Sequence, residues 1–279
     1  MLTYTKRFMP ELPEVETIAR GLAKRVTGDV IESVWLGQKP EPLKSPAREI
    51  AAALEHSRIL GVRRVGKHIV FDLRQNHGKP PQAWQWIVHL GMTGRMQVCE
   101  PQTEIAKHTH AIARLSSGKE VRFVDPRRFG RLSVTRAFQA SGIEPLDAKF
   151  ERFLELFRGR RTPIKSALLN QKLLSGVGNI YADESLFRAG IRPRRRASAI
   201  TRAQFSKLLA AVKQVLQEAI VAGGSSVSDY VDADGEEGFF QLQHRVYGRE
   251  GELCPVCDTR IKRVVVAGRS SHYCPQCQK

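Results

Sequence analysis

The stretch MPELPEVETIARGLAKRV (residues 9–26) joins a proline–glutamate pair to an amphipathic repeat. Apolar residues recur at helical spacing behind Pro13, a residue that suits the first turn of a helix. We therefore expect a helix directly behind Pro10 and Glu11, which holds this pair rigidly at its start. The two acids that follow, Glu14 and Glu16, are interpreted as ordinary first-turn residues that the helix dipole favours.

Pro10 carries a secondary amine only when it is the first residue of the chain, because behind Met9 its nitrogen belongs to an amide. A free α-amino group has a pKa of roughly 7.7–8.0, against about 10.4 for lysine, so more of it is unprotonated at neutral pH. Three explanations stay open: translation begins at Met9 and the methionine is removed, residues 1–9 are cleaved later, or the chain is catalytically silent. We favour the first, and interpret residues 1–9 as a leader that is non-native or removed.

The chain is strongly basic. Its 279 residues include 45 lysines and arginines against 28 acids, a formal net charge of +17. Such a charge predicts a polyanionic partner, although a ribosome or an anionic membrane surface would fit it too. No apolar run approaches the roughly 20 residues that span a bilayer. We expect a monomeric, cytoplasmic protein without a membrane partner.

The secondary-structure signals change along the chain. Residues 62–73, 83–92 and 119–134 mix β-branched and aromatic residues with turn residues and predict a β-rich first domain, with Lys67 inside a strand. Residues 140–147 read as a linker. Helical patterns follow at residues 150–157, at 162–174 behind a Thr162 cap, and at 200–224 behind a Thr201 cap with Gly223 and Gly224 at the end.

Two turns have residue types that suit nucleic acid. The sequence SGVGNIYADESLF (175–187) places Gly176, Gly178 and Asn179 at a turn that opens a helix, where backbone N–H groups can meet a phosphate. The basic runs RGRR (158–161) and RPRRR (192–196) flank it. The sequence DPRRFG (125–130) offers donors and an aromatic ring that can fill the gap left by an extruded base, while an Asp-Pro turn with a buried Phe129 is the structural alternative.

Four of the five cysteines form two close pairs, Cys254 with Cys257 and Cys274 with Cys277, and Cys99 stands apart as a small hydrophobe. This spacing favours one tetrahedral zinc ion over two disulfides. Four thiolates leave no open coordination position, so we expect a structural zinc that stabilises a small hairpin.

Taken together, these motifs resemble the bacterial formamidopyrimidine-DNA glycosylase family from Met9 to Lys279. The matching segments are MPELPEVE, GKHIVFDL, HLGMTG, DPRRFG, GVGNIYADESLF and the terminal YCPQCQK. The resemblance implies an α+β multidomain protein with DNA in the cleft between its two main domains. These are an N-terminal β-sandwich with a leading helix (10–140) and a helix–two-turns–helix domain (141–244), followed by a zinc β-hairpin (245–279).

By the same resemblance, Pro10 is the nucleophile, Glu11 assists base loss and sugar opening, Lys67 assists β-elimination, and Arg269 supports the later elimination and binds phosphate. Three residues fill the void left by the flipped nucleotide: Met92, Arg127 and Phe129. Four match DNA-contacting positions: His108, Arg127, Arg160 and Asn179. Arg160 stands where relatives often carry lysine, and this exchange keeps the phosphate-binding charge.

The resemblance implies a base-excision repair enzyme that removes 8-oxoguanine and formamidopyrimidines from double-stranded DNA and cuts the abasic strand by β- and δ-elimination. One alternative is an endonuclease VIII-like enzyme for oxidised pyrimidines, but the sequence PELPE (10–14) favours the purine branch. Another is a non-catalytic binder of damaged DNA. By resemblance, the loop around residues 224–240 closes over the flipped base, and DNA binding associates the protein with the nucleoid.

Overall fold

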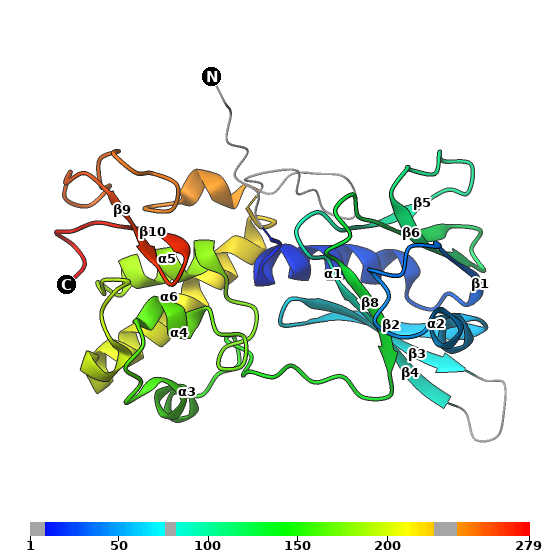
Figure 1. Ribbon diagram of the computed structural model, residues 1–279, viewed down its shortest axis with the longest axis horizontal. Helices are drawn as coiled ribbons and strands as arrows, with labels where there is room; N and C mark the ends of the chain where they lie inside the picture. The colour runs from blue at the N-terminus through cyan, green and yellow to red at the C-terminus, as the bar shows by residue number, and fades with distance from the viewer. Residues whose placement is uncertain (1–8, 76–81, 226–238) are drawn as a thin grey trace. The chain divides into compact units, whose positions relative to one another are not determined.

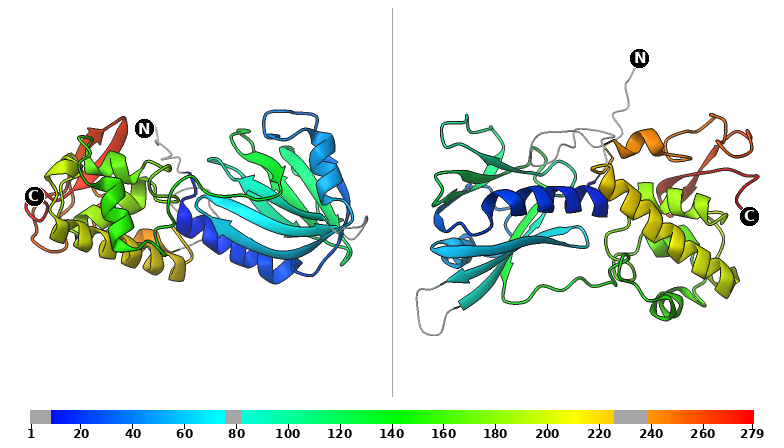
Figure 2. Two further views of the ribbon diagram at one scale, coloured as in Figure 1. Left: turned by 90° about the horizontal axis from the view of Figure 1, so that it is seen from below. Right: turned by 180° about the vertical axis from the view of Figure 1, so that it is seen from behind.

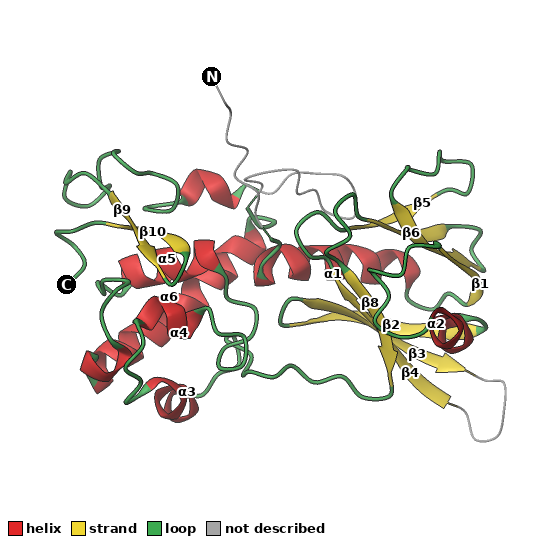
Figure 3. Ribbon diagram, in the orientation of Figure 1, coloured by secondary structure: helices red, strands yellow, loops and turns green. Residues whose placement is uncertain are grey.

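The computed structural model describes residues 9–75, 82–225 and 239–279. Contacts divide these residues into two compact units. The first contains the described residues up to 139 together with 223–225, and the second contains 140–222 and 239–279. The first unit consists of sheets with two helices, and the second is mainly helical (Figure 1, Figure 3). The predicted three-part division stays a prediction.

The first unit contains two antiparallel four-stranded sheets, as expected of a β-sandwich. One has the order β1–β6–β7–β5, with the bounds Ile31–Leu36, Thr109–Leu115, Glu120–Val124 and Arg95–Cys99. The other has the order β2–β3–β4–β8, with the bounds Ser57–Val65, His68–Gln75, Gln82–His89 and Arg131–Thr135. The fold class inferred from the sequence is confirmed, although three of these strands, β1, β5 and β6, lie outside the segments that the sequence pattern predicted.

Helix α1 (Leu12–Val26) begins where the sequence predicted, with Pro13 in its first turn. Its apolar residues recur every three or four positions, so one face is buried against β2 and β3 (Figure 2). This burial joins the helix to the core of both sheets, which includes Phe71, Trp86 and Phe123. The short helix α2 (Ala47–Leu54) was not predicted, and it buries Ile50, Ala53 and Leu54.

The helices of the second unit are α3 (Phe150–Phe157), α4 (Ile164–Leu168), α5 (Asn179–Arg188) and α6 (Arg202–Val221). Two short 3-10 helices, η1 (Ala197–Ala199) and η2 (Phe240–Gln243), and the hairpin of β9 (Lys262–Val266) and β10 (Arg269–Tyr273) complete it. The prediction for 162–174 is wrong in extent, because α4 is one short turn, and the residue at its N-cap position is Pro163 rather than Thr162, with no side-chain capping hydrogen bond. None of the helices within the described ranges is long and apolar enough to cross a lipid bilayer.

The cap of α6 is confirmed, and its contribution to stability is measurable. Thr201 Oγ1 accepts a hydrogen bond from Gln204 N, while Gln204 Oε1 accepts one from Thr201 N at 3.1 Å. We expect Thr201→Ala to lower the free energy of unfolding by about 1 kcal/mol, measured by urea denaturation. Thr201→Ser keeps the hydroxyl and serves as the control. Equal midpoints for the two variants would contradict the capping role.

Candidate active site and nucleic-acid interface

The first turn of α1 fixes the proline–glutamate pair in place. Pro10 is half-buried, and Glu11 caps the helix with only 4% of its surface exposed. The Glu11 N–H donates to Glu14 Oε2 at 2.8 Å, which closes a capping box. The backbone on which both candidate catalytic residues depend is therefore held by a hydrogen bond as well as by the helix.

Glu14 makes a buried long-range contact, whereas the sequence predicted only an ordinary acid in the first turn. It lies in the first turn of α1 as expected, but it is buried, with 3% of its surface exposed, and its Oε1 accepts from Ser225 N at 2.8 Å. Gly224 has a φ of +84°, and a Cβ there would lie 3.1 Å from Glu14. Glu14 thus joins residues 224–225 to the start of α1. Most of the predicted lesion-capping loop, residues 226–238, lies outside the described residues.

Lys67 lies in a turn, so its predicted place inside a strand is wrong. It follows Gly66, whose φ is +60°, in the two-residue connection between β2 and β3. The neighbouring His68 and His89 rings have centroids 4.9 Å apart. Burial, together with the charges of His68, Lys67 and Arg131, lowers the pKa of His89 to about 4. His89 is therefore neutral at physiological pH and adds no positive charge beside Lys67.

The three candidate void-filling residues come from two adjoining loops. Met92 follows β4, whereas Arg127 and Phe129 lie between β7 and β8. A Cβ at Gly91 would approach Phe129 C to 2.6 Å, so the backbones of the two loops touch. Phe129 is 50% exposed, so the alternative of a buried ring is wrong. The Arg127 guanidinium lies 4.6 Å from the centroid of that ring.

The second unit brings Asn179 and Arg269 onto neighbouring segments. Asn179 opens α5, and its Nδ2 donates to the Ser270 carbonyl at 3.0 Å, one residue beyond the exposed Arg269 at the start of β10. Lys165 donates to the same carbonyl at 2.8 Å and lies 2.6 Å from Asp183 Oδ1. Sequence reasoning missed Lys165, because a lysine in the first turn of an amphipathic helix gives no sign that it is fully buried.

The buried Glu184 side chain also holds the backbone segment that precedes the first cysteine pair. Glu184 accepts backbone hydrogen bonds from three consecutive residues, Arg245, Val246 and Tyr247, at 2.8–3.1 Å. Burial raises the pKa of this carboxyl group, and the three N–H donors act in the opposite direction. Residues 245–247 are thereby joined to α5.

The two basic runs have different environments. Arg160 is exposed, and its Nε donates to the carbonyl of Leu156 at the end of α3. In the second run, Arg192 donates to the carbonyls of Gln278 and Pro275 at 2.8 and 2.9 Å, and Arg194 donates to Val265. These two arginines tether the C-terminal hairpin and tail to the helices, a role that the charge pattern did not indicate.

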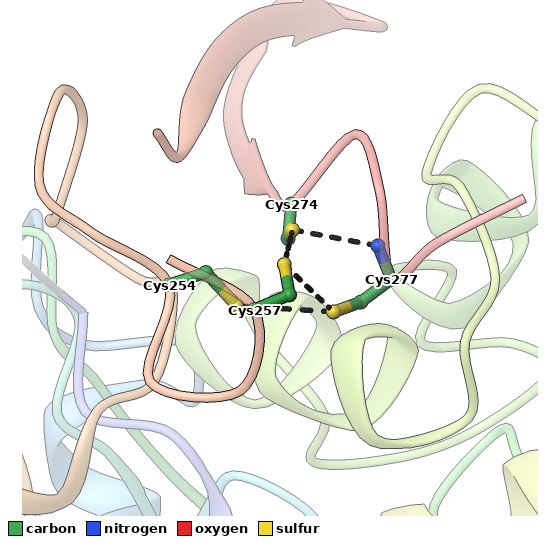
Figure 4. A group of neighbouring side chains, drawn as sticks. All are labelled: Cys254, Cys257, Cys274 and Cys277. Atoms are coloured by element: carbon green, nitrogen blue, oxygen red, sulfur yellow. Dashed lines mark hydrogen bonds between the residues drawn. The ribbon is translucent and has the colours of Figure 1, made fainter. Parts of the chain in front are cut away.

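The four clustered cysteines form a site for one zinc ion (Figure 4). All are free thiols, and their sulfur atoms lie within 4.8 Å of one another. A Zn–S bond of about 2.3 Å gives a tetrahedral site with edges of about 3.8 Å. The observed Sγ–Sγ distances include 3.4 Å for Cys257–Cys274 and 3.9 Å for Cys254–Cys277. The donor set and its size therefore fit zinc.

The zinc hairpin buries a small core. Cys254 and Cys274 pack with Val246, Ile261 and the Phe187 ring of α5. Such a small apolar cluster supplies little stability, so the metal has to hold the hairpin together. Because Arg269 opens β10 in this hairpin, the metal also fixes the position of a candidate phosphate ligand.

Three family models match the chain in order. They are the formamidopyrimidine-DNA glycosylase N-terminal domain at residues 9–132, the H2TH domain of the same enzyme at 142–231, and a zinc finger found in FPG and IleRS at 251–279. Among similar curated proteins, the formamidopyrimidine-DNA glycosylases of Gluconobacter oxydans and Solibacter usitatus are 43% and 44% identical to the chain. Each alignment covers 97% of this chain and all of the relative.

Solved structures give the same result. A Lactococcus lactis FPG mutant in complex with DNA containing Fapy-dG is 32% identical, with a TM-score of 0.87 over 97% of this chain and 100% of that one. The Fpg protein from Thermus thermophilus is 40% identical, with a TM-score of 0.83 over 96% of this chain and 98% of that one.

We predict one zinc ion per chain in freshly purified, reduced protein, measured by elemental analysis. Cys274→Ser should lose the metal, misplace Arg269 and weaken binding to duplex DNA, because the thiolate set is incomplete. Cys99→Ser, which changes a half-buried cysteine outside the cluster, is the matched control and should retain metal and affinity. Full DNA affinity in a zinc-free Cys274→Ser protein would contradict the structural role.

Proposed function

Since this chain belongs to the formamidopyrimidine-DNA glycosylase family, and is thus a base-excision repair DNA glycosylase with AP lyase activity, we propose that it excises oxidised purines through a Schiff base on Pro10. The substrates are 8-oxoguanine and formamidopyrimidines in double-stranded DNA. The observation that supports this most strongly is the ordered match of three family models, from residue 9 to residue 279. The DNA containing Fapy-dG in the complex of the similar Lactococcus lactis protein supports the substrate class.

The proposed chemistry begins with the secondary amine of a chain that starts at Pro10. The amine attacks C1′ of the damaged nucleotide as the bond from C1′ to the base breaks, and opening of the sugar gives an iminium. Glu11 assists base loss and sugar opening, and the capping box holds its backbone. The iminium acidifies C2′, and removal of a C2′ proton expels the 3′ phosphate.

Later steps involve two further basic residues. Lys67 assists the first elimination from the turn between β2 and β3. A second elimination expels the 5′ phosphate with the support of Arg269, whose permanent positive charge suits a departing phosphate. Hydrolysis of the remaining iminium restores the Pro10 amine.

The DNA contacts divide into two kinds. His108, Arg160 and Asn179 hold the sugar–phosphate backbone, and the net charge of +17 supports a large electrostatic contribution. Met92, Arg127 and Phe129 enter the duplex where the damaged nucleotide leaves it, which offsets part of the cost of extrusion. We place the enzyme in the bacterial cytoplasm, at the nucleoid.

The role of the terminal amine is tested with two forms of the protein. A chain that begins at Pro10 should form a covalent adduct with 8-oxoguanine DNA under borohydride, because reduction fixes the Schiff base. A chain that retains residues 1–9 should form none, since its Pro10 nitrogen is an amide. Termini are checked by mass spectrometry and the adduct is measured on denaturing gels. Equal trapping by the intact longer chain would rule out Pro10 and shift suspicion to Lys67.

The role of Arg160 is tested by the salt dependence of DNA binding. We expect Arg160→Ala to weaken binding to damaged and undamaged duplexes alike, and to reduce the slope of log K against log salt by about 1. Arg152→Ala is the control, because this arginine of α3 is 61% exposed and pairs with Glu155. Loss of affinity for lesion-bearing DNA alone would contradict a phosphate contact.

A further inference from the structure

Asp125 is a fully buried acid at the end of β7. Its Oδ1 accepts hydrogen bonds from the Thr93 hydroxyl and from Arg127 N at 3.2 Å. Its Oδ2 accepts from Gly130 N at 2.7 Å. One carboxylate therefore ties Thr93, the residue after Met92, to both ends of the loop that carries Arg127 and Phe129.

The backbone of Asp125 extends this connection to a third segment. Its N–H donates to the His108 carbonyl at 2.9 Å. Its carbonyl lies 2.9 Å from Nε2 of the buried His110, and a carbonyl only accepts, so His110 carries its proton on Nε2. The start of β6 is thus hydrogen-bonded to the backbone of the same acid.

The loop between β7 and β8 needs such a constraint. Arg128 has a φ of +57°, a left-handed conformation that a residue with a side chain rarely adopts. A Cβ at Gly130 would come within 2.4 Å of the Phe123 ring, so the backbone of the loop packs closely against the sheet. A strained conformation persists only where the surrounding contacts determine it. The Asp125 carboxylate supplies such contacts on both sides of Arg128.

We propose that Asp125 is the positioning residue that assembles Met92, Arg127 and Phe129 into a single wedge before DNA binds. The proposal rests on the void-filling role given to these residues under Proposed function. Asp125 itself touches neither DNA nor the reacting atoms. Its carboxylate fixes the backbones of two loops before DNA binds. The side chains that these loops carry can then enter the duplex together, without the cost of ordering them on binding.

The test compares two substrates in chains that begin at Pro10. Single-turnover excision of 8-oxoguanine paired with cytosine requires a stacked base to be extruded. Cleavage of a preformed abasic site requires no base extrusion. Asp125→Asn replaces one carboxylate oxygen by an NH₂ group, which cannot accept a hydrogen bond. This group then faces either Gly130 N–H or the Thr93 hydroxyl and Arg127 N–H. We expect the rate of excision to fall about tenfold, because one buried donor is left without an acceptor. The rate of abasic-site cleavage should change much less.

Two variants address folding and coupling. Thr93→Val removes only the hydroxyl that joins the first loop to Asp125, and should give the same selective loss to a smaller extent. The double variant with Asp125→Asn should lose less than the sum of the single losses, because both changes break one connection. Asp29→Asn is the matched control, since this carboxylate binds Ser116 and Ser117 on the surface, and both of its rates should equal those of the parent.

Phe129→Ala separates the proposal from the function on which it rests. An inactive parent chain would refute the proposed function. Selective loss in Phe129→Ala with unchanged rates in Asp125→Asn and Thr93→Val would overturn the role of Asp125 and leave the proposed function intact. An equal fall on both substrates in Asp125→Asn and Thr93→Val would also overturn it, because a general structural defect does not distinguish base extrusion from strand cleavage.

Discussion

Buried acidic side chains that accept hydrogen bonds from backbone N–H groups hold several loops and one strand of this protein in place. Glu14 accepts from Glu11 and Ser225, Asp125 from Arg127 and Gly130, Asp183 from His272, and Glu184 from residues 245–247. Each of the four carboxylates is at most 3% exposed. Each of these acceptors is shielded from water, so moving the bound segment away would leave a buried polar group without a partner. Three of these acids thereby fix segments without regular structure, and Asp183 fixes the strand β10.

The same principle explains how the chain uses its positive charge. Lys165 is fully buried against Asp183, the guanidinium of Arg122 is buried against Glu120, and Arg192 donates to carbonyls of the C-terminal tail. A buried cation that loses its partner destabilises the fold strongly, so Lys165 and Arg122 are committed to internal contacts. Arg160 and Arg269, by contrast, are exposed. Each of the two buried ion pairs sums to zero, so the net charge of +17 comes from the other charged residues.

The zinc site and the buried Lys165–Asp183 pair both position the β9–β10 hairpin. The metal closes the ends of this hairpin, while the Ser270 carbonyl within it accepts from both Lys165 and Asn179. The hairpin core contains few apolar side chains, so neither packing nor strand pairing alone would fix Arg269. A metal site and a buried polar contact together give this arginine a defined position relative to α5.

Local signals in the sequence determined much of this protein. The helix behind Pro10, the cap at Thr201, the turn that opens α5 and the spacing of four cysteines were all read correctly, because each depends on residues a few positions apart. Only the tertiary structure decided which charged residues are buried. Glu14 meets a partner 211 residues away and Lys165 one that is 105 residues away. A charged side chain looks the same in sequence whether water or a distant backbone group solvates it, so its role is fixed only when the chain folds.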